Sequence, residues 1–219
     1  MDRGQNRSHD SELVVVKGCT IRQEEPRVLT VEEFQALLAA VSKEPFRTML
    51  LFDMCLGLRF SKLIAVQWQD FDWKNLKVRI RRGVVRQVAD DVKTRHSRKP
   101  VPLDPHWRRS CRYGKTEFNK PQDWVWASPA AAGEHPYCYT TLYEMITEAA
   151  TRTKLDGVTW RTLRHSYRSW LDETGAPITV QQNLMRHSDI RTTMNIYGDA
   201  LPATLRAANS RVARMALPN

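Results

Sequence analysis

The sequence has few of the residues that build disulfide frameworks or metal sites. Its 219 residues include four cysteines at scattered positions, with no short paired spacing: Cys19, Cys55, Cys111 and Cys138. His135 and Cys138 form a near-ligand pair, but no second pair accompanies them, whereas structural zinc sites draw on four such ligands. We therefore expect no disulfide framework, no metal site and no cofactor.

Long apolar runs and glycine-rich loops are also missing. No hydrophobic stretch approaches the ~20 residues needed to cross a bilayer, and the N-terminus is polar and charged, unlike a secretory signal. No glycine-rich phosphate loop and no internal repeat occurs in the chain. We expect a cytoplasmic protein that uses neither a membrane nor a small-molecule substrate.

Acidic residues are in short supply relative to basic ones. Lysine and arginine number 34 against 24 aspartates and glutamates, for a formal net charge of +10. A domain this basic is expected to meet a polyanion, and nucleic acid is the first candidate. A basic surface kept for solubility explains the same charge, so charge alone leaves both interpretations open. Hydrophobic residues make up 42% of the chain, enough for a substantial core.

The hydrophobic pattern predicts a mainly α domain with a small antiparallel β-sheet. Residues 1–26 read as an arm or linker, and Thr30 with Glu33 forms a capping box that starts a helix. Helical spacing or helix-terminal signals recur over 30–41, 45–56, 61–66, 140–151, 163–171, 177–185, 190–196 and 201–215. Between them, β-branched runs over 77–88 and 100–103 predict two or three strands in one sheet.

Four residues in a fixed order suggest a chemistry: Arg59, Arg164, His187 and Tyr197. A guanidinium presents a planar fork of donors that matches phosphate oxygens, and an imidazole can donate to the same group. A phenol is a poor nucleophile until nearby cations favour its ionised form. Each residue alone is more often structural, but the set fits a tyrosine attacking a phosphodiester that two arginines hold.

A basic run lies between the predicted strands. Lys93 begins it, and Arg95, Arg98 and Lys99 follow. A lysine on a β-hairpin turn can reach into a groove and protonate a leaving oxygen. The alternative is a solvated basic turn that only touches phosphates, and both interpretations place Arg95, Arg98 and Lys99 in contact with double-stranded DNA.

Five short strings occur in an order that resembles the tyrosine recombinase (phage integrase) family, in its C-terminal catalytic domain. The resemblance covers about residues 26–201. The strings are LGLRFSKL, VKTRHSRKPVPL, TLRHS, LMRHS and TTMNIYG. Each string is weak alone, but the five together, with a basic segment between strands, are specific.

The resemblance implies a role for each position. Arg59 and Arg164 would clamp the scissile phosphate, and His187 would donate to a non-bridging oxygen. Lys93 would protonate the departing 5′-oxygen. Tyr197 would attack and leave a 3′-phosphotyrosyl link. The implied activity is site-specific recombination or integration of DNA, as for a mobile element. The alternatives are a DNA-binding remnant that no longer cleaves, and a type IB topoisomerase-like relaxing activity.

Three positions depart from the family pattern, and all three add positive charge. Arg161 stands where the family usually has a histidine, and an arginine cannot act as a general base. Lys62 replaces an acidic residue that would support the first arginine, and Arg186 replaces a small residue. We count Arg161 with the catalytic positions, as a cation that favours the ionised tyrosine.

The resemblance also suggests a domain division and a partner surface. Residues 27–219 would form the catalytic domain, and the N-terminal core-binding domain typical of the family is absent from this chain. The segment after Tyr197 places Leu205, Ala208, Val212 and Met215 on one helical face. In the family this segment docks on a neighbouring protomer, so the chain is expected to oligomerise on DNA through it; packing within its own domain is the alternative.

Overall fold

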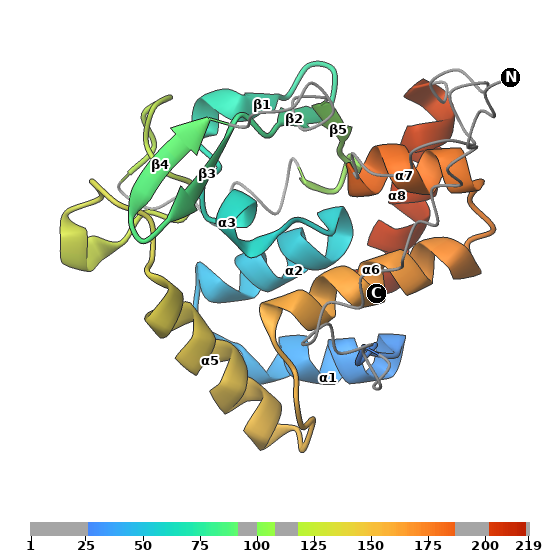
Figure 1. Ribbon diagram of the computed structural model, residues 1–219, viewed down its shortest axis with the longest axis horizontal. Helices are drawn as coiled ribbons and strands as arrows, with labels where there is room; N and C mark the ends of the chain where they lie inside the picture. Colours follow the sequence, from blue (N-terminus) through green and yellow to red (C-terminus); the bar gives the residue numbers. More distant parts are fainter. Residues whose placement is uncertain (1–25, 92–99, 108–117, 187–201, 218–219) are drawn as a thin grey trace, which may run out of the picture.

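A computed structural model describes residues 26–91, 100–107, 118–186 and 202–217, and these fold as the mainly α domain with antiparallel β-structure that the sequence predicts (Figure 1). The helices are α1 (Val31–Ala40), α2 (Phe46–Leu56), α3 (Phe60–Leu63), α5 (Tyr139–Arg152), α6 (Trp160–Glu173), α7 (Ile178–Met185) and α8 (Pro202–Ala216), with short 3-10 turns η1 (Trp68–Asp70) and η3 (Pro129–Ala131). None of the helices in these segments is long and apolar enough to cross a membrane.

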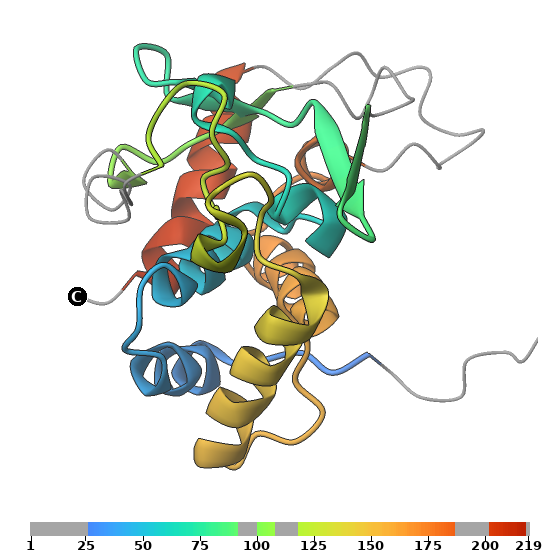
Figure 2. The ribbon, with the colours of Figure 1, turned by 90° about the vertical axis from the view of Figure 1, so that its left-hand side faces the viewer.

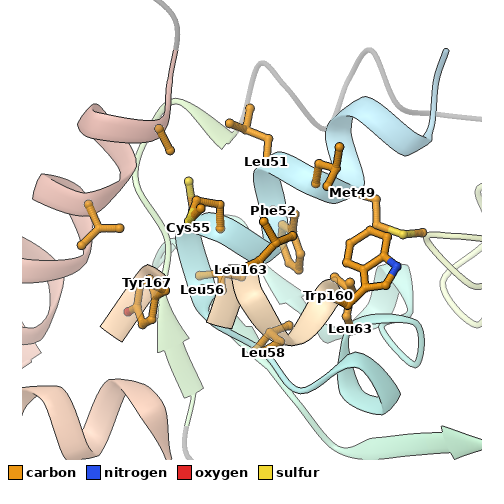
Figure 3. Packing of buried hydrophobic residues seen from close by; sticks show 14 of the residues in the cluster. Met49, Leu51, Phe52, Cys55, Leu56, Leu58, Leu63, Trp160, Leu163 and Tyr167 are labelled. Carbon is orange, nitrogen blue, oxygen red and sulfur yellow. The ribbon is translucent and has the colours of Figure 1, made fainter. Parts of the chain in front are cut away.

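Helix α2 forms the centre of the core. Every residue of α2 except Arg47 is buried, because α6 and α8 pack along it (Figure 1). Figure 3 shows Leu163 and Tyr167 of α6 beside Phe52 and Leu56 of α2. Phe52 also makes edge-on ring contacts with Trp107 and Trp126, at centroid distances of 5.2 and 5.7 Å. A helix buried on all sides reads as continuously apolar, and Asp53 is the buried charged residue in this one.

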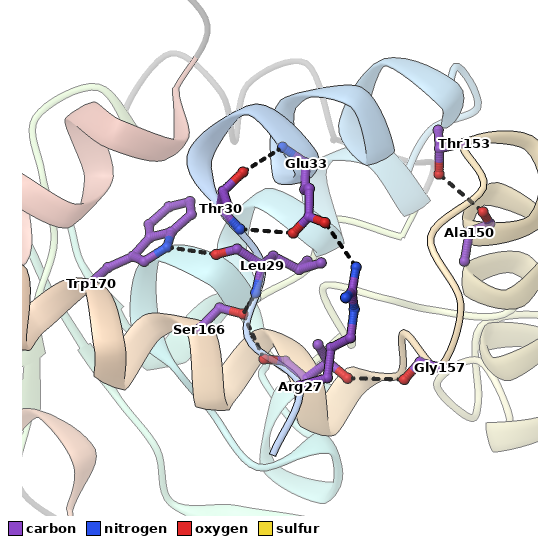
Figure 4. Close-up of polar contacts among 10 residues, drawn as sticks. Arg27, Leu29, Thr30, Glu33, Ala150, Thr153, Gly157, Ser166 and Trp170 are labelled. Carbon is purple, nitrogen blue, oxygen red and sulfur yellow. Dashed lines mark hydrogen bonds and ion pairs between the residues drawn. The ribbon is translucent and has the colours of Figure 1, made fainter. Parts of the chain in front are cut away.

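Helix α1 begins where the sequence predicts, and the residue before its cap joins it to α6. The Thr30 side chain accepts from the Glu33 amide at 3.2 Å, and the Glu33 carboxylate accepts from the Thr30 amide at 3.0 Å. The Leu29 amide donates to Ser166 Oγ at 2.8 Å, and the Leu29 carbonyl accepts from Trp170 Nε1 at 2.9 Å (Figure 4). Helix α1 also lies beside α5, at the opposite end of the molecule from the sheets (Figure 2).

The β-structure differs from the single sheet that the sequence predicts. Strands β1 (Phe71–Asp72), β2 (Lys77–Arg79) and β5 (Pro100–Pro102) form one antiparallel sheet in the order β1-β2-β5. Strands β3 (Arg82–Val85) and β4 (Val88–Asp91) form a separate hairpin. Its turn residues, Arg86 and Gln87, have φ of 50° and 63°. The sequence offers no glycine or asparagine there, so the turn was not predicted.

The basic run between the strands lies outside the described residues. Residues 92–99 connect β4 to β5, whose described residues belong to different sheets. The placement of Lys93 on a hairpin turn therefore stays a prediction.

Helix α8 packs within its own domain. It lies against α2, α6 and α7, and Ala208 and Val212 are buried there as their helical spacing predicts. Asn209 accepts from the Tyr167 hydroxyl at 2.8 Å and donates to the Pro102 carbonyl at 2.8 Å. The tail is thus bonded both to α6 and to the three-stranded sheet.

Candidate active site

The structure describes three of the predicted site residues. Arg59, Arg161 and Arg164 lie in α3 and α6 or at their ends. The others fall outside the described residues, so their predicted roles stay predictions: Lys93, Arg95, Arg98, Lys99, His187 and Tyr197.

Arg164 joins the ends of two helices. Its Nη1 donates to the Gly57 carbonyl at the end of α2, and its Nη2 donates to the Met185 carbonyl at the end of α7, at 3.0 Å. Burial lowers the Arg164 pKa to about 10; the nearby charge of Arg59 adds to this shift, and Asp53 opposes it. Carbonyl partners hold a guanidinium in place without neutralising its positive charge.

Gly57 makes this junction possible. It adopts a left-handed conformation, with φ of 55°, and a Cβ there would lie 2.1 Å from Cδ1 of Tyr167. Tyr167 is fully buried and lies one turn after Leu163 on α6. Glycine therefore lets α2 end directly against α6, with its last carbonyls facing Arg164.

Arg59 is exposed at the start of α3. Its guanidinium takes part in no hydrogen bond or ion pair with any residue that the structure describes. Its charge is nevertheless close enough to lower the pKa of Lys62, Arg164 and Arg186. It is thus a guanidinium available to a ligand, beside a second one held in place.

Two further cations join the site, and both are departures noted in the sequence. Arg186, which ends α7, is 4% exposed, and its Nη1 has no hydrogen-bond partner among the described residues. Burial, followed by the charges of Arg164 and Arg59, lowers the Arg186 pKa to about 10. Burial, followed by the charges of Arg186, Arg59 and Arg164, lowers the Lys62 pKa to about 8.

We call Arg59, Lys62, Arg164 and Arg186 the cationic cluster. Four like charges in mutual electrostatic contact are costly without an anion, so the cluster is built to receive one. A phosphodiester meets the need, because two arginine forks can bind its non-bridging oxygens.

The conformation of Arg186 explains why a small residue is usual at its position. Its φ is 50°, in the left-handed region that disfavours a side chain with a Cβ. The sequence alone marked Arg186 as a departure but not as a member of the site. The signal was available, because a cation that ends an apolar helix segment must lie near something that stabilises it.

Arg161 lies apart from the cluster in electrostatic terms. Its Nε donates to His165 Nε2 one helical turn away, at 3.3 Å, on an exposed part of α6. Its charge is not among those that shift the pKa values of Lys62, Arg164 or Arg186. The structure therefore brings Arg59 and Arg164 together, and leaves the role of Arg161 a prediction.

One buried carboxylate faces the cationic cluster, and the sequence analysis missed it. Asp53 is fully buried on α2, and neither carboxylate oxygen has a hydrogen-bond partner among the described residues. Burial raises the Asp53 pKa well above its usual range, and attraction to Arg164 opposes the rise. Within the segments that the structure describes, no group of three or more His, Cys, Asp or Glu side chains gathers as metal ligands would.

Comparison with known proteins places this geometry in context. The model of the phage integrase family matches residues 27–203. A tyrosine recombinase XerC-like protein of Caldanaerobacter subterraneus is 24% identical, over 86% of this chain and 55% of that protein. Tyrosine recombinase XerD of Pseudomonas aeruginosa is 29% identical, over 85% of this chain and 61% of that protein.

The fold has counterparts among solved structures. The Tn1549 transposon integrase, in complex with transposon right end DNA, superposes with a TM-score of 0.65 and 17% identity, over 88% of this chain and 67% of that chain. At this identity the likeness concerns the fold. The chain spans 55% and 61% of the lengths of the two curated relatives above.

Proposed function

Because the chain belongs to the phage integrase family, we propose that it breaks and rejoins DNA through Tyr197, in site-specific recombination or integration. The observation that carries the proposal is the cationic cluster, in which Arg59 and Arg164 converge and Arg59 has no acidic partner among the described residues. This is the arrangement that a scissile phosphate requires.

The proposed reaction conserves the energy of the bond that it breaks. The Tyr197 phenolate attacks phosphorus, a phosphotyrosyl bond forms, and the bond from phosphorus to the 5′-oxygen breaks. Lys93 gives its proton to the departing oxygen. Arg59, Arg164 and His187 stabilise the additional negative charge on the non-bridging oxygens. Attack by a 5′-hydroxyl of a second duplex reverses these steps and releases the tyrosine, so no nucleotide is consumed.

The three departures fit the same proposal through charge. Lys62 and Arg186 place two more cations around the phosphate, and Arg161, which lies apart from the cluster on α6, would contribute only through its longer-range charge. Positive charge favours the phenolate over the phenol, so it offsets the loss of the histidine that the family usually has at position 161.

Contacts outside the cluster complete the proposal. Arg95, Arg98 and Lys99 would bind the DNA backbone, where each neutralised phosphate steepens the dependence of affinity on salt. Self-association on DNA through the tail stays a prediction. In the described residues α8 is buried against its own domain, so docking on a neighbour requires either its exposed face or its release.

Covalent trapping tests the proposed function. The protein is incubated with nicked duplex DNA that prevents religation, the mixture is denatured, and a protein–DNA adduct is measured. We expect an adduct with the natural chain and none with Tyr197→Phe, which keeps the ring and removes the nucleophile. Arg164→Lys should lower the yield at least tenfold, because lysine cannot bond both helix ends and the phosphate.

The outcomes separate the alternatives. DNA binding without an adduct in either form would indicate a binding remnant. An adduct accompanied by relaxation of supercoiled DNA, with no exchange between two duplexes, would indicate a topoisomerase-like activity.

A further inference from the structure

Asp53 is a buried ionisable group that the proposed chemistry leaves unused. It lies at 0% exposure on α2, one helical turn before Gly57, whose amide donates to the Asp53 carbonyl at 2.7 Å. Its carboxylate oxygens have no hydrogen-bond partner within the described residues. Burial raises the Asp53 pKa, and the charge of Arg164, followed by the Leu58 amide, opposes the rise.

The position of Asp53 relative to Arg164 is defined by the junction of α2 and α6. Arg164 donates to the carbonyl of Gly57, so the guanidinium sits against the last turn of the helix that carries Asp53. Asp53 is 0% exposed, whereas Arg59 is exposed. The carboxylate is therefore on the interior side of Arg164, and Arg59 is on the exposed side.

Several charged or titratable groups surround this position. Arg59 and Lys62 come from α3, Arg164 and Tyr167 from α6, and Arg186 from the end of α7. Burial, followed by the charges of Asp104 and Asp53, raises the pKa of Cys55 on α2. Among these groups Asp53 is a fully buried carboxylate. The charge of Arg164 partly offsets the rise that burial causes in its pKa.

We propose that Asp53 is a positioning residue of the site: its carboxylate balances the charge of Arg164 from the interior while the site is empty, and takes up a proton when a phosphodiester binds on the exposed side. The proposal rests on the proposed function, because it takes the phosphate of DNA as the ligand of the cationic cluster. It assigns to Asp53 the support of an active-site arginine from a different element than Lys62, whose position is usually acidic in the family.

The coupling follows from charge and burial. A phosphate beside Arg164 adds a second negative charge near Asp53, which favours the neutral form of the carboxyl group. Burial has already raised the pKa of that group, and the phosphate shifts it in the same direction. Binding that takes up a proton is tighter at low pH and weakens as pH rises.

Calorimetry measures the proton directly. A 30-base-pair duplex of arbitrary sequence is titrated into the protein at low salt and pH 6.5, in two buffers of different ionisation enthalpy, and the difference in heat gives the protons taken up. At this pH Lys62, with its pKa of about 8, is already protonated. For each duplex bound, we expect the natural chain to gain as much as one proton more than the Asp53→Asn variant gains.

A matched variant controls for a general effect of charge. Asp172 is an exposed aspartate on α6, the helix that carries Arg164, and Asp172→Asn should match the proton uptake of the natural chain. If Asp53→Asn does not fold, Asp53→Ser supplies a smaller neutral residue for the same measurement.

The results distinguish this inference from the proposed function. Equal proton uptake by the natural chain and a folded, DNA-binding Asp53 variant would overturn the inference and leave the proposed function standing. Failure of the natural chain to bind the duplex would overturn both. A difference specific to Asp53 would support the inference, since a purely structural aspartate would change stability but not the protons bound with DNA.

Discussion

Two buried carboxylates, Asp70 and Asp53, are treated in opposite ways by the same fold. Asp70, in η1 beside the sheets, has a side-chain exposure of 1% and is fully partnered. Its Oδ2 accepts from Arg82 Nη1 at 2.8 Å and from the Gln67 amide at 2.9 Å, and Arg81 approaches Oδ1 at 3.5 Å. The carboxylate of Asp53, in α2 beside the cationic cluster, has no hydrogen bond within the described residues.

The difference distinguishes Asp70, whose charge stabilises the fold, from the charges around Asp53, which are suited to binding a ligand. The pair of Asp70 and Arg82 is closed, so neither member has capacity left for another partner. Around Asp53 the positive charges exceed the negative one, and Arg186 has an unbonded Nη1. Such an imbalance destabilises an isolated domain, and it is retained where a site needs charge.

The largest effect is expected from breaking the closed pair. Arg82→Met removes the guanidinium and leaves Asp70 as a buried, uncompensated charge, so unfolding free energy should fall by about 3 kcal/mol or more. Urea denaturation at pH 7 measures this. Arg81→Met is the control, because Arg81 is 49% exposed, and it should cost under about 1 kcal/mol. Equal losses in the two variants would contradict the assignment of the pair to Arg82.

Neutralising Asp53 should raise the free energy of unfolding instead of lowering it. The pKa of Asp53 is raised in the folded protein, so above the usual value of about 3.9 the unfolded chain releases a proton that the folded chain keeps. Stability therefore falls as pH rises from that value to the raised one. Asp53→Asn lacks this fall and should be more stable at pH 7, by about 1–3 kcal/mol. Denaturation curves between pH 4 and 8 test this. If Asp53→Asn were less stable than the natural chain at pH 7, the charge of Asp53 would stabilise the fold as that of Asp70 does.

Arg186→Gly should give a smaller gain. It relieves a left-handed backbone, worth about 1 kcal/mol, and removes a buried donor without a partner. Arg86→Gly is a matched control, because Arg86 has the same φ of 50° but lies exposed in the β3–β4 turn. Thermal unfolding should show a larger rise for Arg186→Gly than for Arg86→Gly. Equal rises would mean that the buried charge of Arg186 costs nothing.

The smallest effect concerns the charge of Lys62. Its pKa is about 8 because of burial and of the surrounding arginines, so it loses its positive charge as pH rises through that value. DNA affinity of the natural chain should then drop a few-fold between pH 7 and 9, since one phosphate contact weakens. Lys62→Arg stays charged and should remove this part of the drop in a fluorescence anisotropy titration. An unchanged pH profile would place Lys62 outside the interface.

The sequence predicts the helical part of this molecule better than the sheets. The α1 capping box and the amphipathic tail are local patterns, and both are confirmed. Helix α6 begins at Trp160 instead of Leu163, because its cap pairs Thr159 with Thr162 and threonine is not the usual third residue of such a box. The two sheets were read as one, since pairing between β2 and β5 joins segments that no local pattern connects.

The candidate site was only partly accessible from sequence. The convergence of Arg59 and Arg164 followed from a family resemblance, because residues so far apart in sequence meet only through the packing of α2 against α6. Asp53 was overlooked although a carboxylate within the apolar run from Met49 to Leu56 is a visible anomaly. Arg164, whose charge attracts it, comes from α6, and the sequence does not show which residues of α2 and α6 lie side by side.

The two hydrogen bonds that join the backbone of Leu29 to α6 have a mechanical consequence. Its amide and carbonyl are both held, by Ser166 and Trp170, and Ser166 lies two residues after Arg164. Tension on the chain ahead of Pro26 is therefore delivered to the middle of α6 before it reaches α1. Helix α6, which carries Arg164, therefore bears the load, and the segment from Pro26 to Thr30 acts as a tether fastened to it.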